Sequence, residues 1–157
     1  MAVVKNQPAK ITNNIDLSIT ERQRFSINND PNRAVFLNVS DASIVARVKE
    51  GYPKLMEIVS KVQKELSNND DTDEALDNLV TSLEVADKEM RALMDEIFDA
   101  KVSDACAPDG TMYDLFDGRF RFEIILESLV KLYTTNMDNE IEALKKKAEK
   151  YTKKYHK

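Results

Sequence analysis

The chain has 157 residues, of which 42% are hydrophobic and 32% are charged, and its formal net charge is −5. With only 3 Gly and 4 Pro, this composition suits one domain of long helices with solvated faces better than a sandwich or barrel rich in turns. The single cysteine, Cys106, excludes an internal disulfide, and no segment resembles a signal peptide or a membrane span. We therefore expect a cytoplasmic protein.

The charges are distributed unevenly along the chain. Residues 1–60 carry 8 basic and 6 acidic side chains, residues 61–130 carry 7 and 18, and residues 131–157 carry 8 and 4. An acidic middle and a basic end fit two arrangements, contacts between the middle of one subunit and the tail of another, or a separate solvated face on each helix.

Residues 1–21 show no clear hydrophobic period and are predicted to form a flexible N-terminal arm, with a short strand at residues 15–19. From Arg22, alternating polar and apolar residues followed by the turn-forming residues 28–32 predict a β-hairpin over residues 22–39, with a loop of four or five residues. The hairpin face that lies on the helices is expected to hold Phe25, Ile27, Val35 and Leu37.

Three long helices are predicted over about residues 41–67, 72–105 and 119–155, because apolar residues recur there at steps of mostly three and four residues. The expected fold class is mainly α, an antiparallel helical bundle with an N-terminal β-hairpin as a minor α+β component. The apolar stripes are Val45, Val48, Tyr52, Leu55, Val59, Val62 and Leu66; then Leu76, Leu79, Leu83, Ala86, Met90, Leu93 and Ile97; then Phe122, Leu126, Leu129, Tyr133, Met137, Ile141, Leu144, Ala148 and Tyr151.

Local signals place the helix starts. Ser40 and Asp41 carry side-chain oxygens that accept hydrogen bonds from a first helical turn, and Pro53 is expected to kink the helix that follows. Asp71 with Glu74 resembles a capping box for the second helix. Together with the stripes, these signals predict a single helical domain over residues 22–157.

Two turns, at residues 107–110 and 114–118, separate the second and third helices. The hydrophobic residues between and within them either tuck into the core under the hairpin or belong to a binding surface. With three residues of the hairpin they form the candidate partner-binding set: Phe25, Ile27, Phe36, Met112, Tyr113, Leu115 and Phe116.

No pattern of residues points to an active site, a cofactor or a metal. The three glycines stand apart, so no phosphate-binding loop is present, and the one histidine, His156, builds no triad or zinc cluster. Cys106 has no histidine near it in sequence and is interpreted as a small hydrophobic residue. The acidic run at residues 70–77 lacks the glycine and bidentate glutamate of a calcium loop. We therefore expect a protein that is not an enzyme.

The lysines and tyrosines of residues 145–157 permit a nucleic-acid surface, but they equally suit a helix end whose cations complement the helix dipole. The acidic balance of the whole chain favours the second interpretation. Extra apolar residues beside the stripes predict self-association or obligatory partner binding: Ile44, Met56, Val85, Met94 and Ile125.

Three segments together resemble a known family: residues 25–33, residues 38–41 and residues 110–118. In order and spacing they are similar to the tail assembly chaperones, or chaperone-like tail proteins, of long-tailed bacteriophages of Gram-positive hosts. The likeness covers most of residues 22–157. The chain departs from the family pattern at Asn29, where a glycine is common.

The resemblance implies a chaperone that coats the tape measure protein, a long helical ruler prone to aggregation, and leaves once that protein reaches the growing tail. It also implies a place in the cytoplasm of the infected bacterial host and absence from the mature virion. Two alternatives stay open: a structural or adaptor subunit retained in a phage tail or related assembly, using the hairpin edge for strand addition, and a small nucleic-acid-binding regulator.

Overall fold

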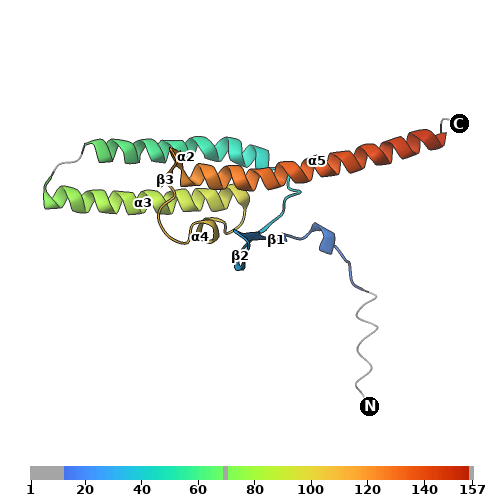
Figure 1. The fold of residues 1–157 in the computed structure, drawn as a ribbon, viewed down its shortest axis with the longest axis horizontal. Coiled ribbons are helices and arrows are strands. Elements are labelled where there is room, and N and C mark those ends of the chain that lie inside the picture. Colours follow the sequence, from blue (N-terminus) through green and yellow to red (C-terminus); the bar gives the residue numbers. More distant parts are fainter. Residues whose placement is uncertain (1–12, 69–70, 156–157) are drawn as a thin grey trace, which may run out of the picture.

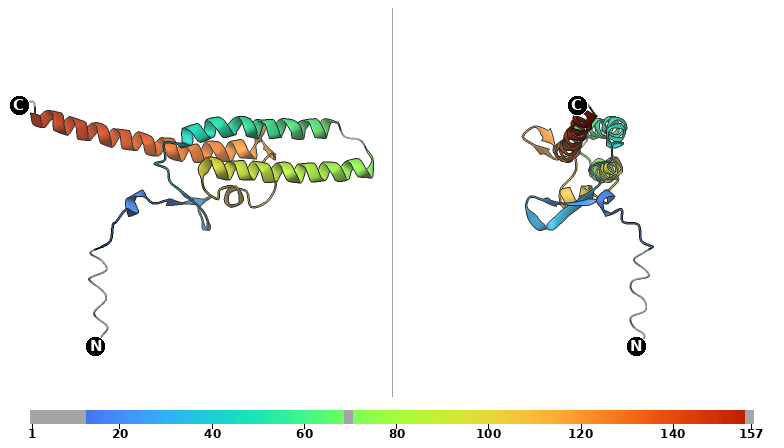
Figure 2. Two further views of the ribbon diagram at one scale, coloured as in Figure 1. Left: turned by 180° about the vertical axis from the view of Figure 1, so that it is seen from behind. Right: turned by 90° about the vertical axis from the view of Figure 1, so that its right-hand side faces the viewer.

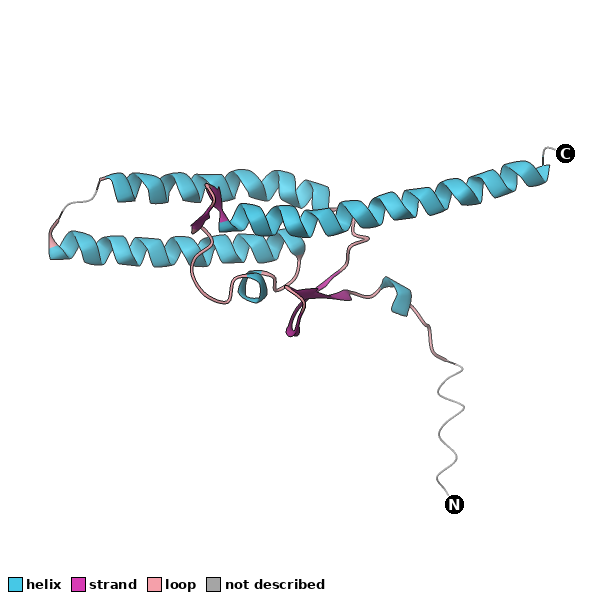
Figure 3. Ribbon diagram, in the orientation of Figure 1, coloured by secondary structure: helices cyan, strands magenta, loops and turns pink. Residues whose placement is uncertain are grey.

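A computed structural model of the protein describes residues 13–68 and 71–155. It is mainly helical with a small antiparallel hairpin near the N-terminus (Figures 1 and 3), which confirms the predicted fold class. In chain order the elements are η2 (Ser18–Thr20), β1 (Gln23–Ile27), β2 (Asp30–Leu37), α2 (Ile44–Ser67), α3 (Asp73–Phe98), α4 (Ser103–Cys106), β3 (Leu115–Phe116), β4 (Arg119–Phe120) and α5 (Arg121–Tyr155).

Helices α2 and α3 form a long antiparallel pair, and α5 lies beside only half of it. In Figures 1 and 2, α5 starts about midway along the pair, runs beside the half that holds the start of α2, and then continues beyond both helices. Two ring contacts join α5 to the pair, from Tyr52 to Phe122 at 6.4 Å between ring centroids and from Phe98 to Tyr133 at 6.0 Å. The helices therefore form a three-helix bundle over part of their length.

The hydrophobic core lies where these three helices overlap, and it extends under the N-terminal hairpin. The predicted stripes are mostly buried in this region. They are exposed at the end of α2, at the start of α3 and in the last part of α5, where no third helix of the described chain covers them. Three residues expected to be surplus to the stripes, Ile44, Met94 and Ile125, belong to the core instead. The large stripe residues that are exposed are Val45, Tyr52, Leu66, Leu76, Ile141 and Leu144.

Helices α2 and α3 approach closely at Gly51. A Cβ atom at this position would lie 2.6 Å from two side-chain carbons of Ile97, which is closer than carbon atoms pack. The missing side chain therefore allows the close approach, and Gly51 is buried in α2 although glycine is a poor helix former. Two residues later, Pro53 lies inside α2.

The first predicted helix start is wrong by three residues. Helix α2 begins at Ile44, not at residue 41, and Ser43 at its N-cap makes no side-chain capping hydrogen bond. Asp41 instead closes the turn before the helix: its carboxylate accepts from the Ser43 N–H at 3.0 Å and from the Ser43 hydroxyl at 2.6 Å. Arg47 also pairs with Asp41, at 3.0 Å.

The predicted capping box is also wrong. The N-cap of α3 is Thr72, whose hydroxyl oxygen accepts a hydrogen bond from the Ala75 N–H at 3.2 Å. The helix then ends at Phe98 and not at residue 105, because Asp99 adopts a left-handed conformation with φ of 48°. Past this break, the carboxylate of Asp95 accepts from the N–H groups of Val102 and Ser103, which starts the short helix α4.

The third helix begins at Arg121, two residues later than predicted, because residues 119–120 pair with β3 in a second small hairpin. Its turn is Asp117-Gly118, where both residues have positive φ, 53° and 76°. These are the residue types that such a tight hairpin turn favours. The turn that the sequence predicts at residues 114–118 therefore exists as the tip of a hairpin.

The N-terminal hairpin confirms the predicted face, since Val35 and Leu37 are buried and Phe25 and Ile27 pack against the core. Its loop is shorter than expected: Ile27 pairs with Asp30, and residues 28 and 29 alone form the turn, with φ of 53° and 58°. The remaining turn-forming residues lie in an irregularity of β2. The strand predicted at residues 15–19 is wrong, because η2 is a 3₁₀ helix there. Residues 1–12 of the predicted arm lie outside the described part of the chain.

Candidate partner-binding groove

An apolar groove lies between the β1–β2 hairpin, the first half of α5 and the β3–β4 hairpin. Its volume is about 460 Å³. Both hairpins lie on the same side of α5 when the molecule is viewed along its long axis (Figure 2, right). We call this the hairpin groove and define it by the lining residues Phe25, Ile27, Phe116, Arg121, Ile124 and Leu132.

Phe116 forms the wall contributed by the β3–β4 hairpin, and it is 47% exposed. The guanidinium of Arg121 lies over its ring, 4.9 Å from the ring centroid, which is within the range of a cation–π contact. Arg121 is itself held by the carbonyl of Asp109 at 2.8 Å and by the carboxylate of Asp114 at 3.5 Å. Its Nε is buried and has no hydrogen-bond partner among the described residues.

Of the seven candidate partner-binding residues, the structure brings three together in this groove: Phe25, Ile27 and Phe116. Phe36 and Leu115 are exposed but do not line it.

Neither of the two alternatives for residues 112–116, burial in the core or a binding surface, holds for the whole segment. The side chain of Met112 is 0% exposed in the core. Tyr113 is partly buried and donates its hydroxyl hydrogen to the carbonyl of Leu83 at 2.7 Å. The segment is thus divided, because its first two residues are packed against α3 while Leu115 and Phe116 stand on the hairpin.

The wall that α5 contributes was missed in the sequence. Ile124, Ser128 and Leu132 line the groove at steps of four residues, beside the buried stripe of the same helix. Residues four apart lie on one helix face, so this second row was a readable signal. It was hidden because the row is short and Ser128, a polar residue, interrupts it.

The sequence also shows no sign of a polar network that holds the loop after α4 in place. Its charged members lie on α3 and have the pattern of solvent-exposed charges. The guanidinium of Arg91 pairs with Asp87 at 2.8 Å and donates to the carbonyls of Ala107 at 2.9 Å and Gly110 at 3.1 Å. Asp87 also accepts from the N–H of Met112 at 2.7 Å. The network holds Met112 in the core and sets the β3–β4 hairpin beside the groove.

Cys106 also lines the groove and packs against the core. Burial raises the pKa of its thiol, and the nearby Arg33 acts in the opposite direction. A protonated, partly buried thiol behaves as a small hydrophobic group. Within residues 13–68 and 71–155, no group of three or more His, Cys, Asp or Glu side chains is arranged to hold a metal ion.

No helix in the described part of the chain is long and apolar enough to cross a membrane. Comparisons of the chain with protein-family models, with characterised proteins and with solved structures find no match. A partner is therefore inferred from the chemistry of the hairpin groove and from the resemblance carried by residues 25–33, 38–41 and 110–118.

Proposed function

We propose that this chain is a non-enzymatic phage tail assembly chaperone that shelters apolar side chains of the tape measure protein in the hairpin groove. One observation carries the proposal, an open apolar groove of about 460 Å³ with a phenylalanine at each side, Phe25 and Phe116. This volume falls within the range of about 300–1,000 Å³ typical of ligand pockets. Burial of apolar surface supplies the free energy of binding.

The shape of the groove supports a helical client. One wall is a helix and two are hairpins, so the groove accepts side chains from one face of an amphipathic helix, as helix-in-groove recognition requires. A long ruler protein with repeated apolar stripes would expose many such faces before the tail forms. The chaperone would act in the host cytoplasm and leave when tail polymerisation covers those faces.

Co-expression with the tape measure protein of the same phage tests the proposal. Phe116→Ser with Ile124→Ser removes apolar surface from the groove, and we expect at least a fivefold lower yield of soluble tape measure protein than with wild type. The matched control is Phe36→Ser with Leu115→Ser, which removes two large exposed side chains outside the groove. Equal yields with both double variants, each as helical as wild type by circular dichroism, would refute the groove as the client site.

An adaptor subunit retained in the assembly is the second candidate. The sheet β1–β2 has two strands, so within the described residues each strand has one edge with no further strand beside it. Such an edge accepts an added strand from a partner. Detection of this chain in purified virions at a fixed number of copies would favour the adaptor over the chaperone.

A further inference from the structure

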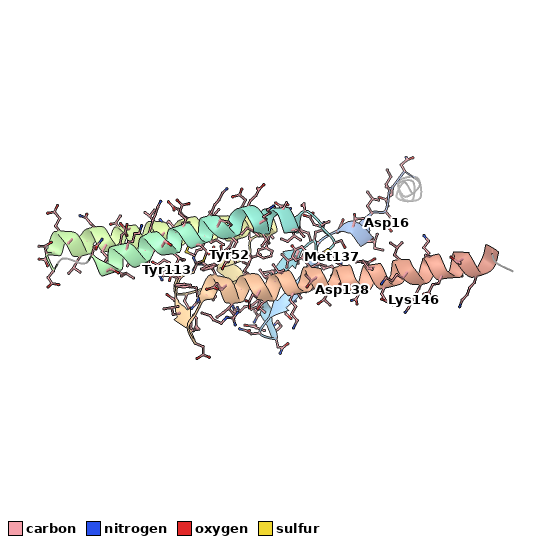
Figure 4. The ribbon with its side chains drawn as sticks, turned by 90° about the horizontal axis from the view of Figure 1, so that it is seen from above. Asp16, Tyr52, Tyr113, Met137, Asp138 and Lys146 are labelled. Carbon is pink, nitrogen blue, oxygen red and sulfur yellow. The ribbon has the colours of Figure 1, made fainter. Side chains whose placement is uncertain are left out.

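The last part of α5 has no packing partner in the described chain. It extends past α2 and α3, and Lys146 lies on this extension (Figure 4). Ile141 and Leu144 are 50% and 66% exposed. They follow Met137 and precede Ala148 at steps of four, three and four residues, the spacing with which a helix covers a neighbouring helix. The stripe therefore has the residue spacing of a packed helix, but no element of the described chain packs against it.

The end of the α2–α3 pair that lies away from this extension has exposed apolar residues and no third helix to cover them. In Figures 1 and 4 its tip extends past the start of α5, so no third helix covers it. Leu66 and Leu76 are 51% and 43% exposed there. Leu66 belongs to the same apolar stripe of α2 as Tyr52, which contacts α5 through Phe122.

At about 3.6 residues per turn, the 14 residues from Tyr52 to Leu66 make close to four turns of α2. Leu66 therefore lies on the same helix face as Tyr52, the face that contacts α5. The same holds on α3. Val80 is also exposed, and it is separated by a whole number of turns from Phe98, which contacts Tyr133 of α5. Val80 therefore shares the face of Phe98. We call the surface of Leu66, Leu76 and Val80 the tip surface.

The charges of the two regions are opposite. Residues 143–153 hold five lysines and one glutamate, whereas residues 73–85 of α3 hold four carboxylates and no lysine or arginine. The lengths also match, because residues 141–155 span about 22 Å and residues 73–85 about 20 Å at 1.5 Å per residue. Complementary charge steers two surfaces together and fixes their register.

We propose that the end of α5 in one copy of this chain docks on the tip surface of a second copy, where it completes the three-helix bundle. The two surfaces differ, so the interface is heterologous and each copy keeps one free surface of one kind after pairing. Assembly therefore continues beyond a dimer, into a ring or an open filament. The interface uses none of the residues that define the hairpin groove, so its failure leaves the proposed client site untouched.

The other possible occupant of the exposed stripe is the same stripe of a second copy. A symmetric pair of α5 ends would bring two lysine clusters together and would leave the tip surface exposed. Such a pair stops at a dimer, which makes the two arrangements distinguishable by mass.

Two variants of the full chain separate them. The tail variant, Ile141→Asp with Leu144→Asp, blocks the end of α5. The tip variant, Leu66→Lys with Leu76→Lys, places positive charges where they repel the lysines of an incoming α5 end. Two controls carry the same changes in charge outside the two charged regions and on other helix faces: Thr135→Asp with Asn139→Asp, and Glu57→Lys alone. All substituted positions are partly or fully exposed, and circular dichroism checks that helicity is kept.

Sedimentation velocity is run on each protein and on an equimolar mixture of the two variants. We expect wild type and both controls to grow beyond a dimer as concentration rises and to shrink as salt rises. Each variant alone should be a monomer, and the mixture should form a 1:1 heterodimer, since it restores one intact pair of surfaces. A tip variant that dimerises alone, a mixture that stays monomeric, a strictly monomeric wild type, or a Glu57→Lys control that no longer assembles would overturn the proposal.

Discussion

Single polar side chains decide where the chain leaves its helices. Asp95 accepts hydrogen bonds from the N–H groups that start α4. Arg91 of α3 donates hydrogen bonds to the carbonyls of Ala107 and Gly110. These residues look like ordinary surface charges in the sequence, because their partners are 7 to 19 residues further along the chain. Periodicity predicts which face of a helix is apolar, but it does not identify such partners.

Replacement of Arg91 by leucine should lower the free energy of unfolding by about 2–3 kcal/mol. The carboxylate of Asp87 loses its cation and two carbonyls lose their donor in a site that is mostly shielded from water. Urea unfolding measures the loss. The control is Arg22→Leu, whose pair with Asp99 is largely exposed and should cost about 0–1 kcal/mol. Similar losses in both variants would contradict the anchoring role.

The turn before α2 should make stability depend on pH. The hydroxyl and N–H of Ser43 lower the pKa of Asp41 in the folded state, with a smaller contribution from Arg47. A lowered folded pKa gives stability that is fully present above the unfolded value of about 3.9 and is lost as pH falls through the folded pKa.

Wild type should therefore be more stable than the Asp41→Asn variant at pH 7, with the difference shrinking below about pH 4. Urea titrations from pH 7 to pH 2 measure it. A difference that stays constant or grows on acidification would show that the carboxylate charge is not what stabilises the turn.

At the scale of elements, the hairpin face and the central parts of the helical stripes could be predicted from the sequence, because both follow from a fixed geometric period. The hairpin groove could be predicted only in part. Phe25 and Ile27 stand out in the sequence as hydrophobic residues of a predicted hairpin, and Phe116 as one of a predicted turn. The α5 wall required knowledge of which helix face the two hairpins cover.

The contact between α2 and α3 gives a test at this scale. Gly51→Val places a branched side chain where a Cβ alone would lie 2.6 Å from Ile97, and overpacking of this kind costs about 1–3 kcal/mol. The better helix propensity of valine offsets only a few tenths of a kcal/mol. Ser60→Val, at an exposed position of the same helix, is the control in thermal unfolding. An unchanged or raised melting temperature for Gly51→Val would show that the helices can move apart freely.

The division of residues 112–116 gives a second test. Met112→Ser empties a fully buried site and should cost about 2–4 kcal/mol. Leu115→Ser changes an exposed position and should stay within about 0.5 kcal/mol of wild type. Chemical denaturation compares the two directly. Equal losses would mean that the β3–β4 hairpin packs against the body of the protein as tightly as Met112 does.

At the scale of the whole molecule, the third stripe is continuous in sequence but not in packing. Leu129 and Tyr133 are buried, while Ile141 and Leu144, which continue the same stripe, are exposed. The period is the same in both halves, so the sequence could not show where α5 leaves the bundle. An extended body with apolar surface at both ends suits a protein that works by covering others and by meeting copies of itself.

Photo-crosslinking tests most directly the claim that the hairpin groove holds the client. A benzophenone amino acid replaces either Ser128, which lines the groove, or Val45, which is exposed at the start of α2 outside it. Each protein is co-expressed with the tape measure protein and irradiated. We predict a crosslinked product with the tape measure protein from position 128 and little from position 45. Crosslinks from position 45 alone, or equal yields from both positions, would contradict the claim.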